Sequence, residues 1–148
     1  MREFLEQIQT TSPSRPVGVI RLVVGGIFLM SGVMKLAVPV LGEAFAGQLE
    51  QAGIPLMALN QWLVPIVEIL LGAFLILGFV SRLLSLVAIA IMLVATYVHL
   101  VVQDPALFPL QPKAPVIPVI VMGLCITLLW RGSGAWSLDL RPRIVPTE

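Results

Sequence analysis

Residues 60–80 read NQWLVPIVEILLGAFLILGFV, an apolar run of membrane-spanning length in which Glu68 is the single charged side chain. An ionised group in the middle of a bilayer costs roughly 2.5 to 3.5 kcal/mol on insertion scales, and such groups commonly mark functional sites. Glu68 is therefore the first candidate for a functional residue. The alternative is an acid that only holds neighbouring helices together, because structural ion pairs also occupy protein interiors.

The composition indicates an integral membrane protein. Of the 148 residues, 58% are apolar and 11% are charged, whereas a soluble domain carries roughly 25% charged residues. The apolar runs are far longer than the roughly 10-residue alternating segments of a membrane barrel. We therefore expect an all-α membrane bundle, with the lipid bilayer rather than nucleic acid as its partner.

Hydropathy predicts four spans, at about residues 17–38, 60–80, 83–102 and 116–130. An even number of spans returns both termini to one side of the membrane. More cationic residues fall on that side than on the other, so the positive-inside rule predicts that both termini are cytoplasmic and that the protein is a multi-pass protein of the inner membrane. The cations on the terminal side are Arg2, Arg15, Arg21, Arg82, Arg131, Arg141 and Arg143, and those on the outer side are Lys35 and Lys113.

The chain divides into three parts around these spans. Residues 1–16 lack an apolar core, so we expect no secretory signal peptide there, and either a short interfacial helix or a polar tail. Residues 17–131 form the predicted membrane domain, and residues 132–148 form a cytoplasmic C-terminal tail. The second and third spans are joined by a tight predicted turn at Ser81 and Arg82.

The first outer connection, residues 39–59, has helical spacing near its centre. We predict a short amphipathic helix that lies across the outer ends of the bundle like a lid, or that only anchors the chain at the interface. Its apolar face contains Phe45, Leu49 and Ala52, and its polar side contains Glu43, Glu50 and Gln51.

The first span carries a face that should point into protein. Arg21, Gly25, Phe28, Gly32 and Lys35 are spaced four, three, four and three residues apart, which aligns them along one side of a helix. The glycines would let another helix approach closely. We therefore name Gly25, Gly32 and Gly72 as helix-packing candidates. We expect Arg21 to reach the interface by snorkelling, and Lys35 either to do the same or to face the protein.

Five polar side chains fall in the predicted outer half of the bundle: Lys35, Glu68, His99, Gln103 and Asp104. Counting from the predicted turn at 1.5 Å per residue places His99 about 6 Å nearer the outer surface than Glu68. Such groups could exchange protons with water, bind the hydroxyl of a quinol or hold a small polar substrate. They are the candidates for ligand binding or proton exchange, and no catalytic residue is assigned.

Other chemistries are less well supported. The scattered acids and one histidine include no close ligand pair at helical spacing, so we predict no metal site. Cys125 excludes an internal disulfide and an iron–sulfur cluster held by this chain alone, and we expect its thiol to be an inert small hydrophobe. The sequence contains no phosphate loop, nucleotide fingerprint or nucleophile elbow. The sequence therefore predicts no intrinsic cofactor.

The order of several short motifs resembles the DoxX family of small bacterial and archaeal membrane proteins. The similarity covers roughly residues 17–140. The motifs are Arg21-Leu22, Gly25, Phe28, Ser31-Gly32 and Lys35-Leu36 in the first span, Phe45, Leu49 and Gly53-Ile54-Pro55 in the connection, then Glu68, Gly72, Gly78 and Arg82, and finally residues 132–139 with the sequence GSGAWSLD.

This resemblance implies a four-helix bundle in the cytoplasmic membrane. Some relatives are associated with quinol oxidase or thiosulfate:quinone oxidoreductase systems, and others with membrane redox-stress complexes or assembly. The resemblance assigns no catalytic role to the matching residues, which are Arg21, Lys35, Glu68, Arg82, His99 and Asp139.

Two hypotheses follow. In the first, the chain is a subunit of a quinone-linked membrane redox system, in which Lys35, Glu68 and His99 line an outer-half pocket for a quinone or quinol. In the second, it is a structural or chaperone-like assembly protein whose buried charges only specify helix packing. Either version allows redox-complex subunits or further copies of the chain as partners.

Overall fold

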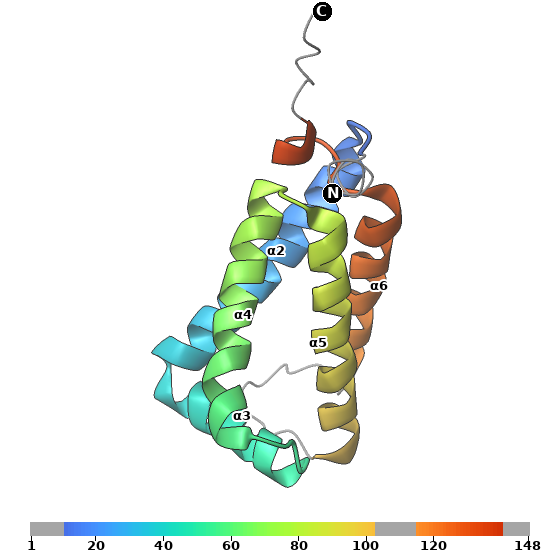
Figure 1. Ribbon diagram of the computed structural model, residues 1–148. Coiled ribbons are helices and arrows are strands. Elements are labelled where there is room, and N and C mark those ends of the chain that lie inside the picture. Colours follow the sequence, from blue (N-terminus) through green and yellow to red (C-terminus); the bar gives the residue numbers. More distant parts are fainter. Residues whose placement is uncertain (1–10, 103–114, 141–148) are drawn as a thin grey trace, which may run out of the picture.

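The computed structural model describes residues 11–102 and 115–140, and the regular elements in this part of the chain are all helices. Figure 1 shows long helices that form a bundle and a shorter helix that lies across one end of it. The elements are α2 (Arg15–Ala37), α3 (Pro39–Gln51), α4 (Met57–Leu77), α5 (Ser81–Val101), α6 (Val116–Arg131) and the short 3₁₀ turn η1 (Leu138–Leu140).

Prolines set the boundary between the first two helices. Pro16 lies in the first turn of α2, where a backbone amide has no partner within the helix. Pro39 disfavours helical geometry at the residue before it, and Val38 is accordingly extended, with φ −111° and ψ 104°. Pro39 then begins α3, so the chain changes direction within one residue.

The turn between α4 and α5 lies three residues earlier than the sequence predicted. Gly78 ends α4 in the left-handed region with φ 69°, and α5 already begins at Ser81. The predicted turn at Ser81 and Arg82 is therefore wrong. The cause is a distant carboxylate: Asp139 accepts hydrogen bonds from the amides of Val80 and Ser81, at 3.0 and 3.3 Å, and so starts α5 early.

Three of the described helices, α2, α4 and α5, are long and apolar enough to cross a membrane. The fourth, α6, is apolar but has 16 residues, which corresponds to roughly 24 Å against a hydrocarbon core of about 30 Å. The predicted all-α membrane bundle is confirmed. The cytoplasmic location of both termini stays a prediction. The division of the chain into segments 1–16, 17–131 and 132–148 stays a prediction as well.

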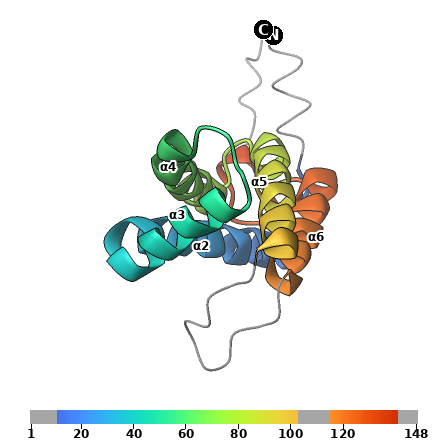
Figure 2. The same ribbon diagram turned by 90° about the horizontal axis from the view of Figure 1, so that it is seen from below.

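The bundle is built from two helix pairs. The most extensive contacts are those of α2 with α4, followed by those of α5 with α6, and α5 and α6 run side by side in both ribbon views (Figures 1 and 2). Nine buried apolar residues join the pairs in one core: Val17, Val24, Phe28, Leu71, Leu75, Ala88, Val121, Cys125 and Leu128.

Glycines allow α2 and α4 to approach at backbone distance. A Cβ atom added at Gly72 would overlap the backbone of Gly25 and Leu29, and one added at Gly32 would overlap the carbonyl oxygen of Pro65. The structure thus places all three helix-packing candidates at the α2–α4 contact. Small residues at such a contact let dispersion forces act over a large area where no hydrophobic effect drives helix association.

The amphipathic helix predicted in the first connection is present as α3. Glu43, Glu50 and Gln51 are exposed, whereas Leu49 and Ala52 are buried. Seen from below, α3 crosses the ends of α2 and α4 and reaches toward α5 (Figure 2). Ala52 there packs in a second small core with Val98 and Val102 at the end of α5. The helix therefore ties the two pairs together at this end of the bundle, the α3 end.

The glycine contact provides a test of the α2–α4 packing. Gly72→Ala should lower stability by about 1 to 3 kcal/mol, because the added methyl group meets backbone atoms that cannot rotate away. Gly26→Ala is the matched control on α2, where an added Cβ meets nothing within 4 Å, so it should be neutral or slightly stabilising. Thermal unfolding of the purified variants in mild detergent measures both effects. Equal stability of the two variants would contradict the close packing at Gly72.

Candidate functional site

The candidate site is centred on an ion pair between Lys35 of α2 and Glu68 of α4. The Lys35 ammonium donates to both carboxylate oxygens of Glu68, each at 2.7 Å. The Ser31 hydroxyl donates to Oε2 of the same carboxylate at 3.3 Å. The Glu68 side chain is 3% exposed and that of Lys35 is 20% exposed. The carboxylate is thus enclosed by protein, while its cationic partner keeps some contact with the outside.

Helix geometry explains why these groups meet. Ser31 and Lys35 are four residues apart and so lie one above the other on α2. Gly32, between them in sequence, brings α2 close to the α4 turn that begins at Pro65. That approach carries Glu68 within hydrogen-bonding distance of both side chains.

Helix α3 covers the cation. The Lys35 Nζ atom lies 4.6 Å from the centroid of the Phe45 ring, which is cation–π geometry. Phe45 is on the apolar face predicted for this helix. The ammonium is therefore held by a carboxylate on one side and an aromatic ring on another, and α3 is attached to the site as well as to the bundle.

One other predicted member of the site, His99, lies among the described residues. His99 lies half-buried in the last turn of α5, and the hydrogen bonds of the Glu68 carboxylate within the described residues come from Ser31 and Lys35. Gln103 and Asp104 lie outside the described residues. A pocket shared by Glu68 and His99 stays a prediction. Ser31 belongs to the cluster, although its sequence pattern marked it only as part of a family motif and not as a site candidate.

Arg21 forms a second polar centre, at the opposite end of α2. Its side chain is fully buried and donates to five backbone carbonyl oxygens. The expectation that Arg21 snorkels to the interface is wrong. Snorkelling would leave those carbonyls without donors in an apolar environment, and the flat guanidinium has enough N–H groups to serve all five. The acceptors are Leu75 and Ile76, at 2.5 Å, Ser133 at 2.8 Å, Trp136 at 3.0 Å and Ala135 at 3.2 Å.

The segment after α6 completes this end of the bundle, the η1 end. Residues 132–135 are buried, and the amides of Gly134 and Ala135 donate to Thr11 Oγ1 and the Ser14 carbonyl at 2.8 and 2.9 Å. Asp139 accepts from the Ser133 hydroxyl as well as from the amides at the start of α5. The first nine residues of the predicted tail thus pack on the bundle.

Cys125 lies in the core between the helices and is fully buried. Its neighbours in that core are aliphatic and aromatic side chains. A thiol in such surroundings behaves as a small apolar group, because a reactive thiolate needs a polar and partly exposed setting.

Comparison with known proteins places the chain in a family. The DoxX family model matches residues 17–100, which contain Arg21 and the Lys35–Glu68 pair. This chain belongs to the DoxX family. It is also 34% identical to the uncharacterized membrane protein Rv3486 of Mycobacterium tuberculosis over 131 residues, which cover 82% of this chain and 78% of that protein. No solved structure matches.

The buried arginine of this DoxX protein is open to a direct test. Arg21→Lys should lower stability by on the order of 3 kcal/mol, because an ammonium offers three donors from one point and leaves buried carbonyls unpaired. Arg15→Lys is the matched control, since Arg15 is exposed on the same helix. Thermal unfolding in mild detergent separates the two, and an unchanged Arg21→Lys protein would refute the structural role.

Substitutions of the two residues of the ion pair should lower stability by different amounts. Lys35→Met should destabilise the protein by about 3 to 5 kcal/mol, because it leaves the carboxylate buried without its partner. Glu68→Gln should have a smaller effect, because the partly exposed ammonium can turn toward the interface. A double-mutant cycle with both changes should give a coupling energy of at least about 1 kcal/mol. Additive effects of the two changes would mean that the pair does not contribute to folding.

Proposed function

We propose that this DoxX protein is a subunit of a quinone-linked membrane redox system and that the Lys35–Glu68 pair, with Ser31, holds the head group of a quinone or quinol. The observation that carries the proposal is the pair itself. Within the described residues it is the one ion pair, and it joins two largely apolar helices, α2 and α4. A buried charge pair in a membrane domain is a functional candidate because its insertion is unfavourable.

The chemistry of the pair suits such a ligand. A quinol hydroxyl can donate to the Glu68 carboxylate, and a quinone carbonyl can accept from the Lys35 ammonium. Oxidation of a bound quinol to the quinone releases two protons and two electrons. Glu68 and the water at the α3 end take up the protons, and a redox centre in a partner subunit takes up the electrons.

The exposure of Lys35 supports the accessibility of this site. The ammonium is one-fifth exposed, and its contact with Phe45 belongs to α3, the helix that crosses this end. Rotation of the lysine side chain away from the carboxylate would make room for a ligand hydroxyl without moving α2 or α4. In this proposal α3 covers the site, and His99 extends it toward α5.

The distribution of cations supports a location in the inner membrane with both ends in the cytoplasm. Arg15, Arg82 and Arg131 lie at the η1 end, whereas Lys35 belongs to the α3 end. Under the positive-inside rule the η1 end is then cytoplasmic and the ion pair lies in the outer half of the bilayer. Protons released there would leave on the outer side.

A second candidate is a structural or assembly function without a ligand. The Arg21 network favours it, because that buried charge is fully used in holding the protein together. Lys35 and Glu68 would then do the same at the other end. Partners in this case are further membrane subunits or copies of this chain.

Quinone content after purification tests the first proposal. Wild-type protein extracted in mild detergent should retain quinone that organic extraction and mass spectrometry detect, and Glu68→Gln should retain about tenfold less, since a hydrogen bond to a charged group contributes roughly 1.5 to 3 kcal/mol. Glu50→Gln is the matched control, because Glu50 is exposed on α3. This control variant should retain quinone at the wild-type level.

Thermal unfolding of the same samples separates the two functions. A Glu68→Gln protein that folds well and has lost quinone supports the redox subunit. If Glu68→Gln lowers the unfolding temperature, and wild type neither retains quinone nor binds added quinone, the structural function is supported. That result refutes the first proposal.

A further inference from the structure

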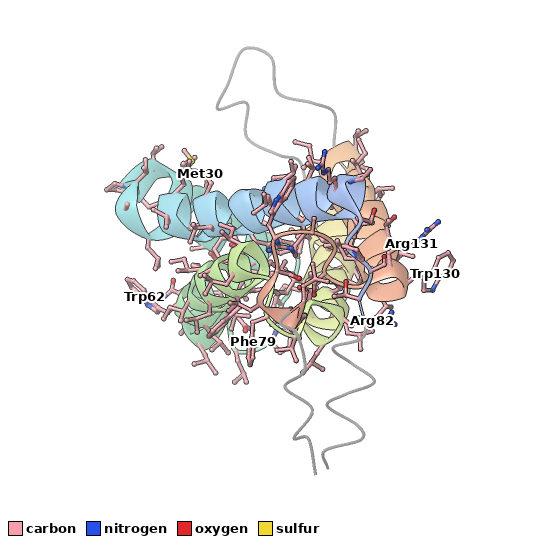
Figure 3. The ribbon with its side chains drawn as sticks, turned by 90° about the horizontal axis from the view of Figure 1, so that it is seen from above. Met30, Trp62, Phe79, Arg82, Trp130 and Arg131 are labelled. Carbon is pink, nitrogen blue, oxygen red and sulfur yellow. The ribbon has the colours of Figure 1, made fainter. Side chains whose placement is uncertain are left out.

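Two arginines lie at the η1 end of the bundle, where α5 begins and α6 ends. Arg82 of α5 donates from Nη2 to the carbonyl oxygen of Trp130 at 3.1 Å, and Arg131 follows directly along the chain. Figure 3 shows Arg82, Trp130 and Arg131 together at one edge of the bundle, with the Trp130 and Arg131 side chains directed outward. The hydrogen bond fixes Arg82 against α6.

These cations have no anionic partner among the described residues. Asp139 is the acid that contacts the start of α5, and its carboxylate is already bonded to the amides of Val80 and Ser81 and to the hydroxyl of Ser133. The described ion pair is at the other end of the molecule. Among residues 11–102 and 115–140, the two guanidinium charges at this edge therefore have no counter-charge.

Arg82 also retains an unused donor. Its Nε atom is buried and has no hydrogen-bond partner in the part of the chain that the structure describes, and a buried donor without an acceptor is costly. A guanidinium has a planar set of donors that matches the oxygens of a phosphate group. The terminal Nη groups lie at the exposed end of this side chain, where an anionic group from outside the protein would accept from them and neutralise the charge.

The position of the cluster indicates the source of such an acceptor. Trp130 is 75% exposed, and exposed tryptophans at the ends of spanning helices favour the level of the lipid head groups. Leu83 and Leu86, next along α5, are exposed apolar residues that suit acyl chains. Basic sites between spanning helices bind the head groups of anionic lipids, and each arginine near an anionic surface contributes about 1 kcal/mol.

We propose that Arg82, Arg131 and Trp130 form a binding site for the phosphate of an anionic phospholipid drawn from the surrounding bilayer. The two arginines bind the phosphate, with Arg82 held in position by the Trp130 carbonyl, and the indole packs beside the head group. The site is separate from the Lys35–Glu68 pair and does not depend on its function.

Native mass spectrometry of delipidated protein tests the site, with phosphatidylglycerol and phosphatidylcholine of the same acyl chains added at equal concentration. Wild type should bind phosphatidylglycerol preferentially. Arg131→Gln should weaken that binding roughly fivefold, and Arg82→Gln with Arg131→Gln roughly 25-fold, from the contribution of about 1 kcal/mol per arginine. Arg15→Gln is the control, because it removes the same charge from an exposed residue at the same end.

The outcomes are distinguishable. Loss of the preference in the Arg82 and Arg131 variants, with Arg15→Gln unchanged, supports the site. An equal loss in Arg15→Gln, or no preference in wild type, overturns it in favour of general charge attraction. Displacement of phosphatidylglycerol by inorganic phosphate at low millimolar concentration overturns the lipid as ligand in favour of free phosphate. Arg131 makes no described side-chain bond, so its variant remains informative even if Arg82→Gln folds poorly.

Discussion

The fold depends on one buried guanidinium. Arg21 lies in the apolar part of α2, in a setting where an uncompensated charge would oppose insertion. Its five acceptors come from the end of α4 and from the segment that follows α6. Those carbonyls lie in the last turn of a helix and in an irregular segment, and a membrane protein must supply hydrogen-bond donors for such groups from within the protein. A single side chain thus stabilises the end of α4 and fixes the C-terminal segment against the bundle.

That docking then determines how the second helix pair is attached. Because Ser133 and Ala135 are bonded to Arg21, Asp139 is carried to the start of α5, where it accepts from the amides of Val80 and Ser81. The α4–α5 turn and the first residue of α5 are therefore consequences of the Arg21 network. At the α3 end, Ala52 and Val98 make an apolar connection between the same two halves.

The features that could be predicted from the sequence are those with a local pattern. Apolar runs located the helices, and the spacing from Arg21 to Lys35 identified the α2 face that packs on α4, because a helix repeats every 3.6 residues. The role of Arg21 could not be predicted, since its acceptors are backbone carbonyls, which every residue type carries. For the same reason the turn was placed too late: its determinant, Asp139, is about sixty residues away. The predicted topology assigned Lys35 and Glu68 to the same half of the bundle. Counting along the helices gave the height of His99 relative to Glu68, but not its direction around α5.

Arg21, Lys35 and Arg82 differ in how many of their N–H groups are hydrogen-bonded within the protein. That difference bears on function. Arg21 is surrounded by neutral acceptors and fully buried, so a ligand could enter only by breaking the fold. Lys35 shares a carboxylate and a ring and keeps partial exposure, which allows exchange of its partner for another group. Arg82 has a buried Nε without an acceptor and lies beside an exposed cation and an exposed indole. In an apolar solvent, where every unpaired donor is unfavourable, incomplete satisfaction is the physical mark of a place where something else binds. By that criterion we expect ligands on two surfaces of the bundle, at the η1 end of α5 and α6 and at the α3 end of α2 and α4. Arg21 holds the helices that carry these surfaces in position relative to one another.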